Sequence, residues 1–195
     1  MTNPDEVLAG WQDKFRPHDD GARLPPHHDH CLACGPENPH GHHLVVHRRG
    51  EEVHAVHRFD QRHVGAPGIA HGGAVATVLD DLFGFLLYLT GSPAVTRQLD
   101  VRYDSPVLLG VTYELVARTV HAEGRKLFLE ADMQDTSGTT VAFASALFLR
   151  VDLAHFRQGA TNSQPPPGAA TTPTSPNPSD STPDIRSPRR DRPPA

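Results

Sequence analysis

The run Gly72–Thr90, GGAVATVLDDLFGFLLYLT, constrains the fold more than any other part of the chain. Its apolar residues recur at helical spacing, which predicts a long helix with one face packed on a core. That face is formed by Val75, Val78, Leu79, Leu82, Leu86 and Leu89. The same run contains Asp80 and Asp81, although burying a carboxylate is costly unless something compensates.

Two runs before this helix and four after it have the pattern of strands. They alternate in polarity or are rich in β-branched and aromatic residues, and turn-like segments such as Gly50-Glu51, EGR and TSG separate them. The runs are 42–49, 51–59, 94–103, 111–122, 126–135 and 139–153. Their short connections favour an antiparallel sheet with the helix on one face, an α+β fold.

The remaining segments divide the chain into three parts. Residues 1–30 contain a short amphipathic helix over 5–15, followed by a loop rich in proline and histidine. Residues 31–156 carry the helix and the strands. Residues 157–195 hold more than half of the prolines and almost no large apolar residue, which predicts a disordered tail.

Charge and composition exclude several classes of protein. The formal net charge is −5, which is not typical of a nucleic-acid binder. We expect no membrane span, and the acidic first residues do not form a secretory signal. With only two cysteines, Cys31 and Cys34, the chain is expected to be cytoplasmic and reduced.

Asp80 and the start of the helix form a candidate catalytic pair. Asp80 lies off the core face, on the side of Thr77 and Gly84. The N–H groups of Gly72 and Gly73 have no acceptor within the helix, and the helix dipole there favours negative charge. Such donors form an oxyanion site, and a carboxylate within reach of it activates water or attacks directly. The alternatives are an ordinary turn and a solvated aspartate.

The segment GAPGIAHGGAVATVLDD resembles the signature of PaaI-type acyl-CoA thioesterases. The resemblance continues through TRQLDVRYDSPV and EGRKLFLEADMQD and covers residues 31–152. It implies the hotdog fold, an antiparallel sheet wrapped around one long central helix. Some members carry an asparagine where this chain has Gly65, so the subgroup with a threonine at the position of Thr96 is the better match.

The resemblance assigns a role to each matching residue. Asp80 is expected to act as general base or nucleophile in the hydrolysis of an acyl-CoA thioester, and Gly73 or Gly72 N–H to polarise the carbonyl. His71 would orient the turn or the carbonyl, and Thr96 would hold the water. The site would lie between subunits of a homodimer, or of a dimer of dimers, with His-Gly-Gly from one chain and Asp80 from the other. Asp81 is the weaker candidate, a hydrogen-bonded or solvated neighbour.

The phosphates of coenzyme A need cations, and no separate cofactor is expected. Candidate substrate-binding residues are Arg97, Arg102, Arg125, Lys126 and, in a loop that folds over the site in related thioesterases, Asn38. Each of the cations is also compatible with an ordinary surface charge.

Cys31 and Cys34 have the C-x₂-C spacing of a zinc site, with histidines on both sides. Two further ligands would have to come from His27, His28, His30, His40, His42 or His43, and none of these completes a usual second pair. We therefore predict a packed loop with turn chemistry at Asn38-Pro39, and no metal.

Two other functions are compatible with the fold that the resemblance implies. One is a hotdog hydratase or dehydratase, and the other is a non-catalytic acyl-CoA-binding protein. Release of free thiol from acyl-CoA would distinguish hydrolysis from both.

Overall fold

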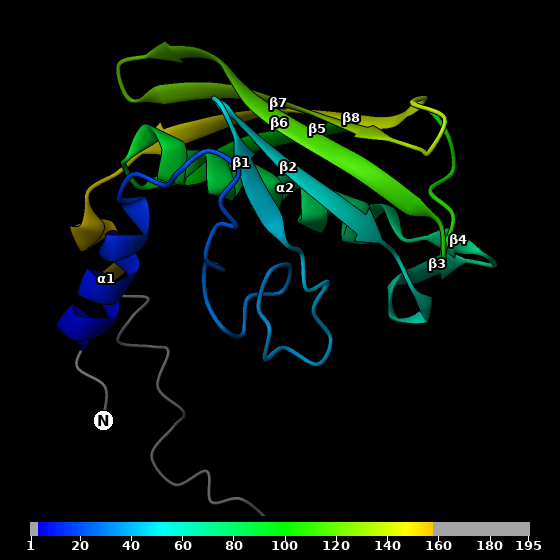
Figure 1. Ribbon diagram of the computed structural model, residues 1–195, viewed down its shortest axis with the longest axis horizontal. Coiled ribbons are helices and arrows are strands. Elements are labelled where there is room, and N and C mark those ends of the chain that lie inside the picture. The colour runs from blue at the N-terminus through cyan, green and yellow to red at the C-terminus, as the bar shows by residue number, and fades with distance from the viewer. Residues whose placement is uncertain (1–3, 158–195) are drawn as a thin grey trace, which may run out of the picture. The chain divides into compact units, whose positions relative to one another are not determined.

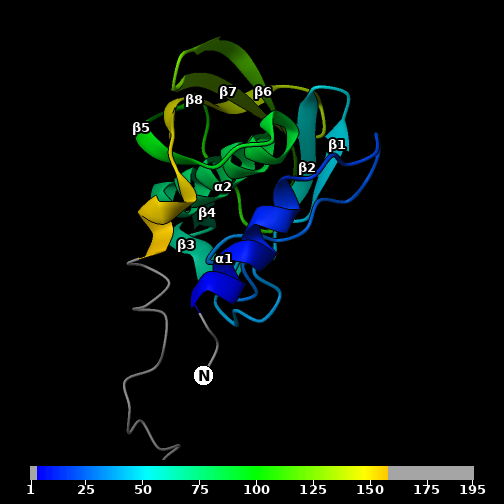
Figure 2. The ribbon, with the colours of Figure 1, turned by 90° about the vertical axis from the view of Figure 1, so that its left-hand side faces the viewer.

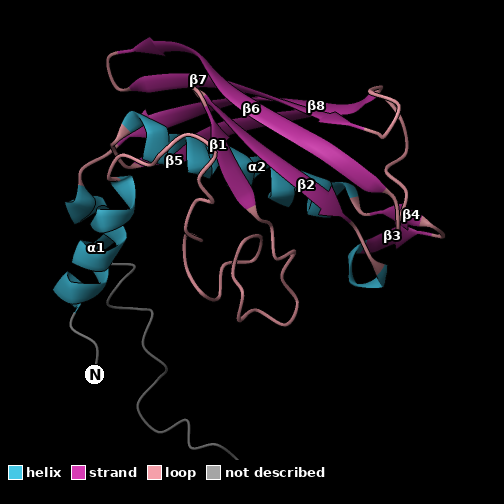
Figure 3. Ribbon diagram, in the orientation of Figure 1, coloured by secondary structure: helices cyan, strands magenta, loops and turns pink. Residues whose placement is uncertain are grey.

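A six-stranded antiparallel sheet curves around one long helix, α2, as expected of a hotdog fold (Figures 1 and 3). The computed structural model describes residues 4–157, so the predicted disordered tail lies outside the described residues. The strand order is β1-β2-β6-β7-β8-β5. The strands are β1 (Val46–Arg49), β2 (Glu52–Arg58), β5 (Ala94–Tyr103), β6 (Thr112–Glu123), β7 (Lys126–Gln134) and β8 (Thr140–Arg150).

Helix α2 (Gly72–Thr90) lies along the concave face of the sheet (Figure 1). His71 caps its start, and Gly91 ends it in the left-handed region at φ 68°. Nine of its side chains are buried, including five of the six predicted on the core face. By length and hydropathy alone α2 could cross a membrane, contrary to the sequence expectation, but half of that span is buried inside the protein. The same apolar residues form the core of a folded domain.

The edge strand β5 contains a bulge that changes which face its side chains occupy. Thr96 pairs with Phe148 and Gln98 with Leu147, so Arg97 is an extra residue without a partner opposite. Successive strand residues point to opposite faces, and one inserted residue reverses the alternation beyond it. Thr96 and Tyr103 are seven positions apart, yet both side chains contact α2, through Asp80 and Gly72.

The N-terminal segment packs against the end of α2. It comprises α1 (Pro4–Gln12) and the 3₁₀ turn η1 (Asp13–Phe15), close to the predicted helix over 5–15. Trp11 contacts the Phe15 and Phe156 rings, at centroid distances of 5.0 and 4.7 Å. Phe15 in turn packs edge-on against Tyr88 of α2 at 5.2 Å. Figure 2 shows α1 beside the 3₁₀ turn η3 (Leu153–Phe156) that follows the last strand.

A short hairpin precedes α2, in a segment where the sequence predicted no strand. The 3₁₀ turn η2 (Gln61–His63) leads into β3 (Val64–Ala66), which pairs with β4 (Ile69–Ala70). Asp60 begins this segment with a capping box that joins it to His63. The hairpin delivers the chain to His71 at the start of the helix.

Candidate active site

The start of α2 is arranged by the imidazole of His71. Its Nδ1 accepts a hydrogen bond from Gly73 N–H at 2.9 Å, so that glycine N–H is already occupied. Among the described residues, no hydrogen bond is made by Gly72 N–H. Sequence reasoning allowed either glycine as the oxyanion donor, and the geometry favours Gly72. A neutral His71 whose Nδ1 accepts carries its proton on Nε2, which gives a second donor at the exposed helix start.

Gly65 is required by the close approach of β3 to this turn. A Cβ atom at Gly65 would lie 2.6 Å from the Cα of His71, closer than any side chain tolerates. His71 N–H also donates to His63 O at 2.7 Å, which draws the two segments together. The missing asparagine at Gly65 is therefore explained by backbone packing.

Asp80 lies at the middle of α2, where its carboxylate meets the edge strand. Thr96 Oγ1 donates to Asp80 Oδ1 at 2.9 Å. Both residues line a cavity of about 260 Å³ together with His27, Gly84 and Phe148. Burial raises the pKa of Asp80, while the Thr96 hydrogen bond and the nearby His27 act in the opposite direction. Thr96 thus orients the carboxylate in addition to any contact with water.

The two halves of the predicted site do not meet within one chain. Asp80 is nine residues beyond His71, which places it about 13 Å along a helix with a rise of 1.5 Å per residue. Tyr103 lies beside the first half, where its hydroxyl donates to Gly72 O at 2.7 Å. Gly72 and Tyr103 line a second cavity, of about 460 Å³. Strand β5 therefore carries Thr96 near one end and Tyr103 at the other, one beside each half.

Asp81 is mostly removed from solvent, and it is not the solvated neighbour that the sequence allowed. Its side chain is 11% exposed, and its Oδ1 lies 2.9 Å from His27 Nδ1. Cys31 Sγ lies 3.3 Å from the same oxygen. The predicted hydrogen-bonded role is confirmed, with partners from the loop that precedes β1. That loop reaches α2 next to Asp80, because His27 lines the cavity shared with Asp80.

The expected substrate-binding residues are spread over the molecule. Arg102 is ion-paired with Asp104 at 2.8 Å and lies over the Phe143 ring at 5.1 Å. Arg97 is the exposed bulge residue of β5. Arg125 and Lys126 lie at the exposed turn between β6 and β7, where Arg125 Nε donates to a carbonyl oxygen at 3.0 Å.

Asn38 is engaged within its own loop. Its Nδ2 donates to His30 O at 3.2 Å, and its Oδ1 accepts from His40 N–H at 3.0 Å. In this arrangement the side chain shapes the loop, as the predicted turn at Asn38-Pro39 implies.

A buried cluster of three histidines, which sequence reasoning missed, lies behind the hairpin. His42 and His63 are stacked with ring centroids 3.9 Å apart, and His57 lies 5.3 Å from His42. All three are less than 9% exposed, and each has a buried ring nitrogen without a partner in the described part of the chain. Burial lowers the pKa of His42 to about 3 and that of His57 to about 4. The cluster is therefore neutral at pH 7.

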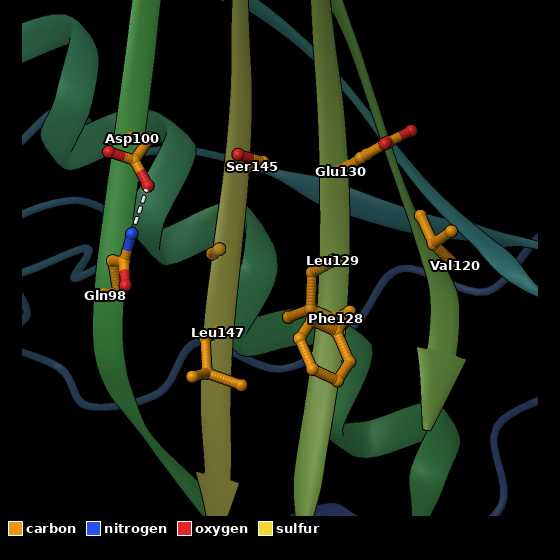
Figure 4. A pocket seen from close by; sticks show the side chains of 9 residues that line it. Gln98, Asp100, Val120, Phe128, Leu129, Glu130, Ser145 and Leu147 are labelled. Atoms are coloured by element: carbon orange, nitrogen blue, oxygen red, sulfur yellow. Dashed lines mark hydrogen bonds between the residues drawn. The ribbon is translucent and has the colours of Figure 1, made fainter. Parts of the chain in front are cut away.

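A hollow of about 270 Å³ lies on the outer face of the sheet, opposite α2 (Figure 4). Gln98 and Asp100 form a hydrogen bond of 2.6 Å along one side of it, and Phe128 and Leu147 also line it. It contains none of the predicted catalytic residues.

Comparison with known families decides the relationship of the central segment. Residues 67–142 match the model of the thioesterase superfamily. This segment is therefore similar to members of that superfamily. It includes Asp80 and the helix start, together with the edge strand that carries Thr96.

Curated relatives match a little under half of the chain. Acyl-coenzyme A thioesterase THEM4 of Rattus norvegicus is 35% identical over 89 residues, which is 45% of this chain and 38% of the rat protein. THEM5 of Mus musculus is 31% identical over 90 residues, 46% of this chain and 36% of that protein. The chain therefore spans well under half the length of these relatives.

Solved structures confirm the hotdog fold. A thioesterase superfamily protein has a TM-score of 0.60 at 24% identity, over 74% of each chain. The PaaI protein of E. coli has a TM-score of 0.54 at 15% identity, over 57% of this chain and 81% of that one. A hypothetical thioesterase of Streptococcus pneumoniae, solved with coenzyme A, has a TM-score of 0.50 at 21% identity, over 51% and 81%.

Proposed function

We propose that this chain hydrolyses an acyl-CoA thioester, with Asp80 of one subunit acting beside the helix start of a second subunit. The Asp80–Thr96 pair near one end of β5 carries the proposal, because it holds a partly buried carboxylate within a cavity of the superfamily segment. The names of the relatives agree with this activity, as does coenzyme A in the streptococcal structure.

The shared site follows from the position of β5 at the edge of the sheet. In the described structure this strand pairs only with β8, which leaves its other edge open to a second chain. Antiparallel pairing of two β5 strands about a two-fold axis near Leu99 would bring Thr96 of each chain toward Tyr103 of the other. Asp80 would then face Gly72 of the partner. Two halves that lie about 13 Å apart along one helix would thus be brought together by two chains.

The proposed reaction needs few groups. Gly72 N–H and His71 Nε2–H polarise the thioester carbonyl at the helix start, where the dipole favours the developing oxyanion. Asp80 either removes a proton from a water molecule that attacks the carbonyl carbon, or attacks that carbon itself to form an acyl anhydride that water then hydrolyses. Coenzyme A leaves as a thiolate, and a thiol with a pKa of about 8.5 needs little protonation to depart. No metal takes part in these steps.

The streptococcal protein offers a further parallel. Its structure was also solved with one aspartate and, separately, one threonine replaced by alanine, and the two positions are sixteen residues apart. Asp80 and Thr96 have the same separation.

The proposed location is the cytoplasm, where Cys31 and Cys34 stay reduced.

The test is a panel of acyl-CoA substrates with free thiol as the readout. Asp80→Asn should lower kcat by about 10²–10⁴-fold, the usual effect of losing a general base. Asp19→Asn, at an exposed aspartate outside β5 and outside the cavity that contains Asp80, is the matched control and should keep the parent rate. Asp81→Asn, assayed below its melting temperature, should be much milder than Asp80→Asn.

Three results would contradict the proposal. A rate for Asp80→Asn within threefold of the parent would remove Asp80 from the mechanism. Binding of acyl-CoA by the parent without thiol release would indicate a binding protein. An active monomer in sedimentation equilibrium would exclude the shared site.

A further inference from the structure

Four metal-ligating side chains converge where the loop before β1 meets α2. They are His27, Cys31, Cys34 and Asp81, and their ligand atoms all lie within 4.8 Å of one another. His27 Nδ1 is 2.9 Å from Asp81 Oδ1 and 3.4 Å from Cys34 Sγ, and Cys31 Sγ is 3.3 Å from Asp81 Oδ1. Three of the residues come from within eight positions of the loop, and the fourth comes from the helix.

These separations are close to those of a tetrahedral metal centre. With Zn–S near 2.3 Å and Zn–N or Zn–O near 2.0–2.1 Å, neighbouring ligand atoms are about 3.3–3.8 Å apart. Two thiolates with one imidazole and one carboxylate form a donor set suited to zinc. We propose that His27, Cys31, Cys34 and Asp81 bind one Zn²⁺ ion that fastens the loop to α2. This reverses the sequence prediction of no metal.

The loop backbone is folded as a support for the two sulfurs. His27 N–H donates to Cys34 Sγ at 3.2 Å, and Gly35 N–H donates to Cys31 O at 3.1 Å. A Cβ atom at Gly35 would lie 2.3 Å from the Cys31 nitrogen, so only glycine fits this turn. N–H groups aimed at sulfur belong to the outer shell that orients metal ligands. The turn therefore holds Cys31 and Cys34 toward His27.

The imidazole of His27 packs against α2 at a position where the helix has a glycine. Gly84 lies one turn beyond Asp80, and a Cβ atom there would be 2.8 Å from Cε1 of His27. Glycine inside a helix costs about 0.5–1 kcal/mol relative to alanine, so its place here is explained by the ring. Phe85 packs on the same ring, with centroids 4.3 Å apart.

The cluster retains polar atoms that lack partners. Asp81 Oδ2 and His27 Nε2 are buried without a hydrogen bond among the described residues. The His27 and Asp81 side chains are only 19% and 11% exposed. Buried charges are stable when they are paired or when they coordinate a metal. A Zn²⁺ ion among the four ligands would offset two of the three negative charges of the carboxylate and the two thiolates.

The ion would have a structural role. Four protein ligands close a tetrahedral site and leave no position for water or substrate. Lys14 Nζ donates to Pro26 O and His27 O, at 2.6 and 3.0 Å, so η1 is attached to the same segment. The metal would thus hold the loop and the N-terminal segment against the wall of the cavity that contains Asp80. This inference does not depend on the proposed hydrolysis.

The test uses the full chain, purified from zinc-supplemented cells and dialysed against metal-free buffer. Elemental analysis should find about one zinc per chain in the parent and in His40→Gln, an exposed histidine of the same loop. Cys31→Ser and Cys34→Ser should lose the metal, and its removal from the parent should lower the melting temperature. Cobalt in place of zinc should give a thiolate charge-transfer band and the visible bands of tetrahedral coordination.

A second variant covers the case in which the cysteine variants do not fold. Gly84→Ala should raise helix propensity but displace the ring of His27, and it should weaken cobalt affinity by about 10- to 100-fold. An unchanged cobalt affinity in Gly84→Ala would contradict the proposal that the His27 ring must pack on Gly84 to bind the metal. A metal-free parent with two titratable thiols would show a hydrogen-bonded cluster, and one with no titratable thiols would show a disulfide. Either result would overturn the zinc proposal.

Discussion

The buried histidine cluster should make the fold sensitive to acid. His42 and His57 are 8% and 7% exposed, and their pKa values are lowered to about 3 and about 4, chiefly by burial. The charged groups around them are Asp60 and Arg62, and His63 is the third, neutral member of the cluster. In the unfolded chain both imidazoles return to a pKa of about 6.5. Below that pH these two histidines bind protons in the unfolded state and remain neutral in the folded state.

The size of the effect follows from this difference in protonation. Stability is fully present above about pH 6.5 and falls as the pH drops toward the folded values, because the unfolded state binds more protons. Each pH unit contributes about 1.4 kcal/mol per histidine, so lowering the pH from 7 to 5 costs about 2 kcal/mol for each and about 4 kcal/mol for both. That is a large fraction of the 5–15 kcal/mol typical of a domain.

Urea unfolding at the two pH values measures this directly. The parent should lose about 2 kcal/mol more than either His42→Gln or His57→Gln between pH 7 and pH 5. Glutamine does not titrate, so its constant packing cost cancels when each variant is compared with itself at the two pH values. Equal losses in the parent and both variants would show that the imidazoles become protonated while folded, and the reasoning would be refuted.

Two further predictions concern the active site. Thr96→Val should lower kcat by about 10- to 100-fold with little change in KM, since a hydrogen bond to a charged group contributes about 1.5–3 kcal/mol. Thr96→Ser keeps the hydroxyl and should restore most of the rate. An unchanged kcat in the valine variant would remove the threonine from the mechanism. Mixing the inactive variants His71→Ala and Asp80→Asn under conditions of subunit exchange should recover about a quarter of the parent rate. Half of the dimers would then contain one variant of each kind, and each of these would have one intact shared site out of two. No recovery would place both residues in the same chain's site.

The regular elements could be predicted from the sequence because their signals are local. The apolar period of α2 and the alternation along β5 are present in the residues themselves, and the predicted strand over 94–103 has the same bounds as β5. Asp80 was placed off the core face by the helical wheel alone. The hydrogen bond between Thr96 and Asp80 places the two residues side by side, as the resemblance implies for residues of one site. The resemblance, however, implies that Thr96 binds the water molecule, whereas here it donates to the carboxylate.

The remaining features depend on contacts between distant segments. Nothing local to His27 indicates that it packs on Gly84, since 57 positions separate them and the contact forms only when the loop folds across α2. The occupation of Gly73 N–H by His71 depends on one side-chain rotamer. The spacing rules for zinc search for a second pair in sequence, whereas in the proposed site the fourth ligand atom belongs to Asp81, on another element.

The bulge at Arg97 determines which face of the sheet the side chains on either side of it occupy. A regular strand from Thr96 to Tyr103 would place these two residues on opposite faces, so one would leave the helix and turn toward the hollow that Gln98 and Asp100 line. Deleting Arg97 would therefore do more than remove a positive charge, because it would invert one end of the strand relative to the other. Among homologues of this chain, length changes within β5 should be tolerated only in pairs of residues, whereas a substitution at position 97 should leave the alternation of the strand unchanged.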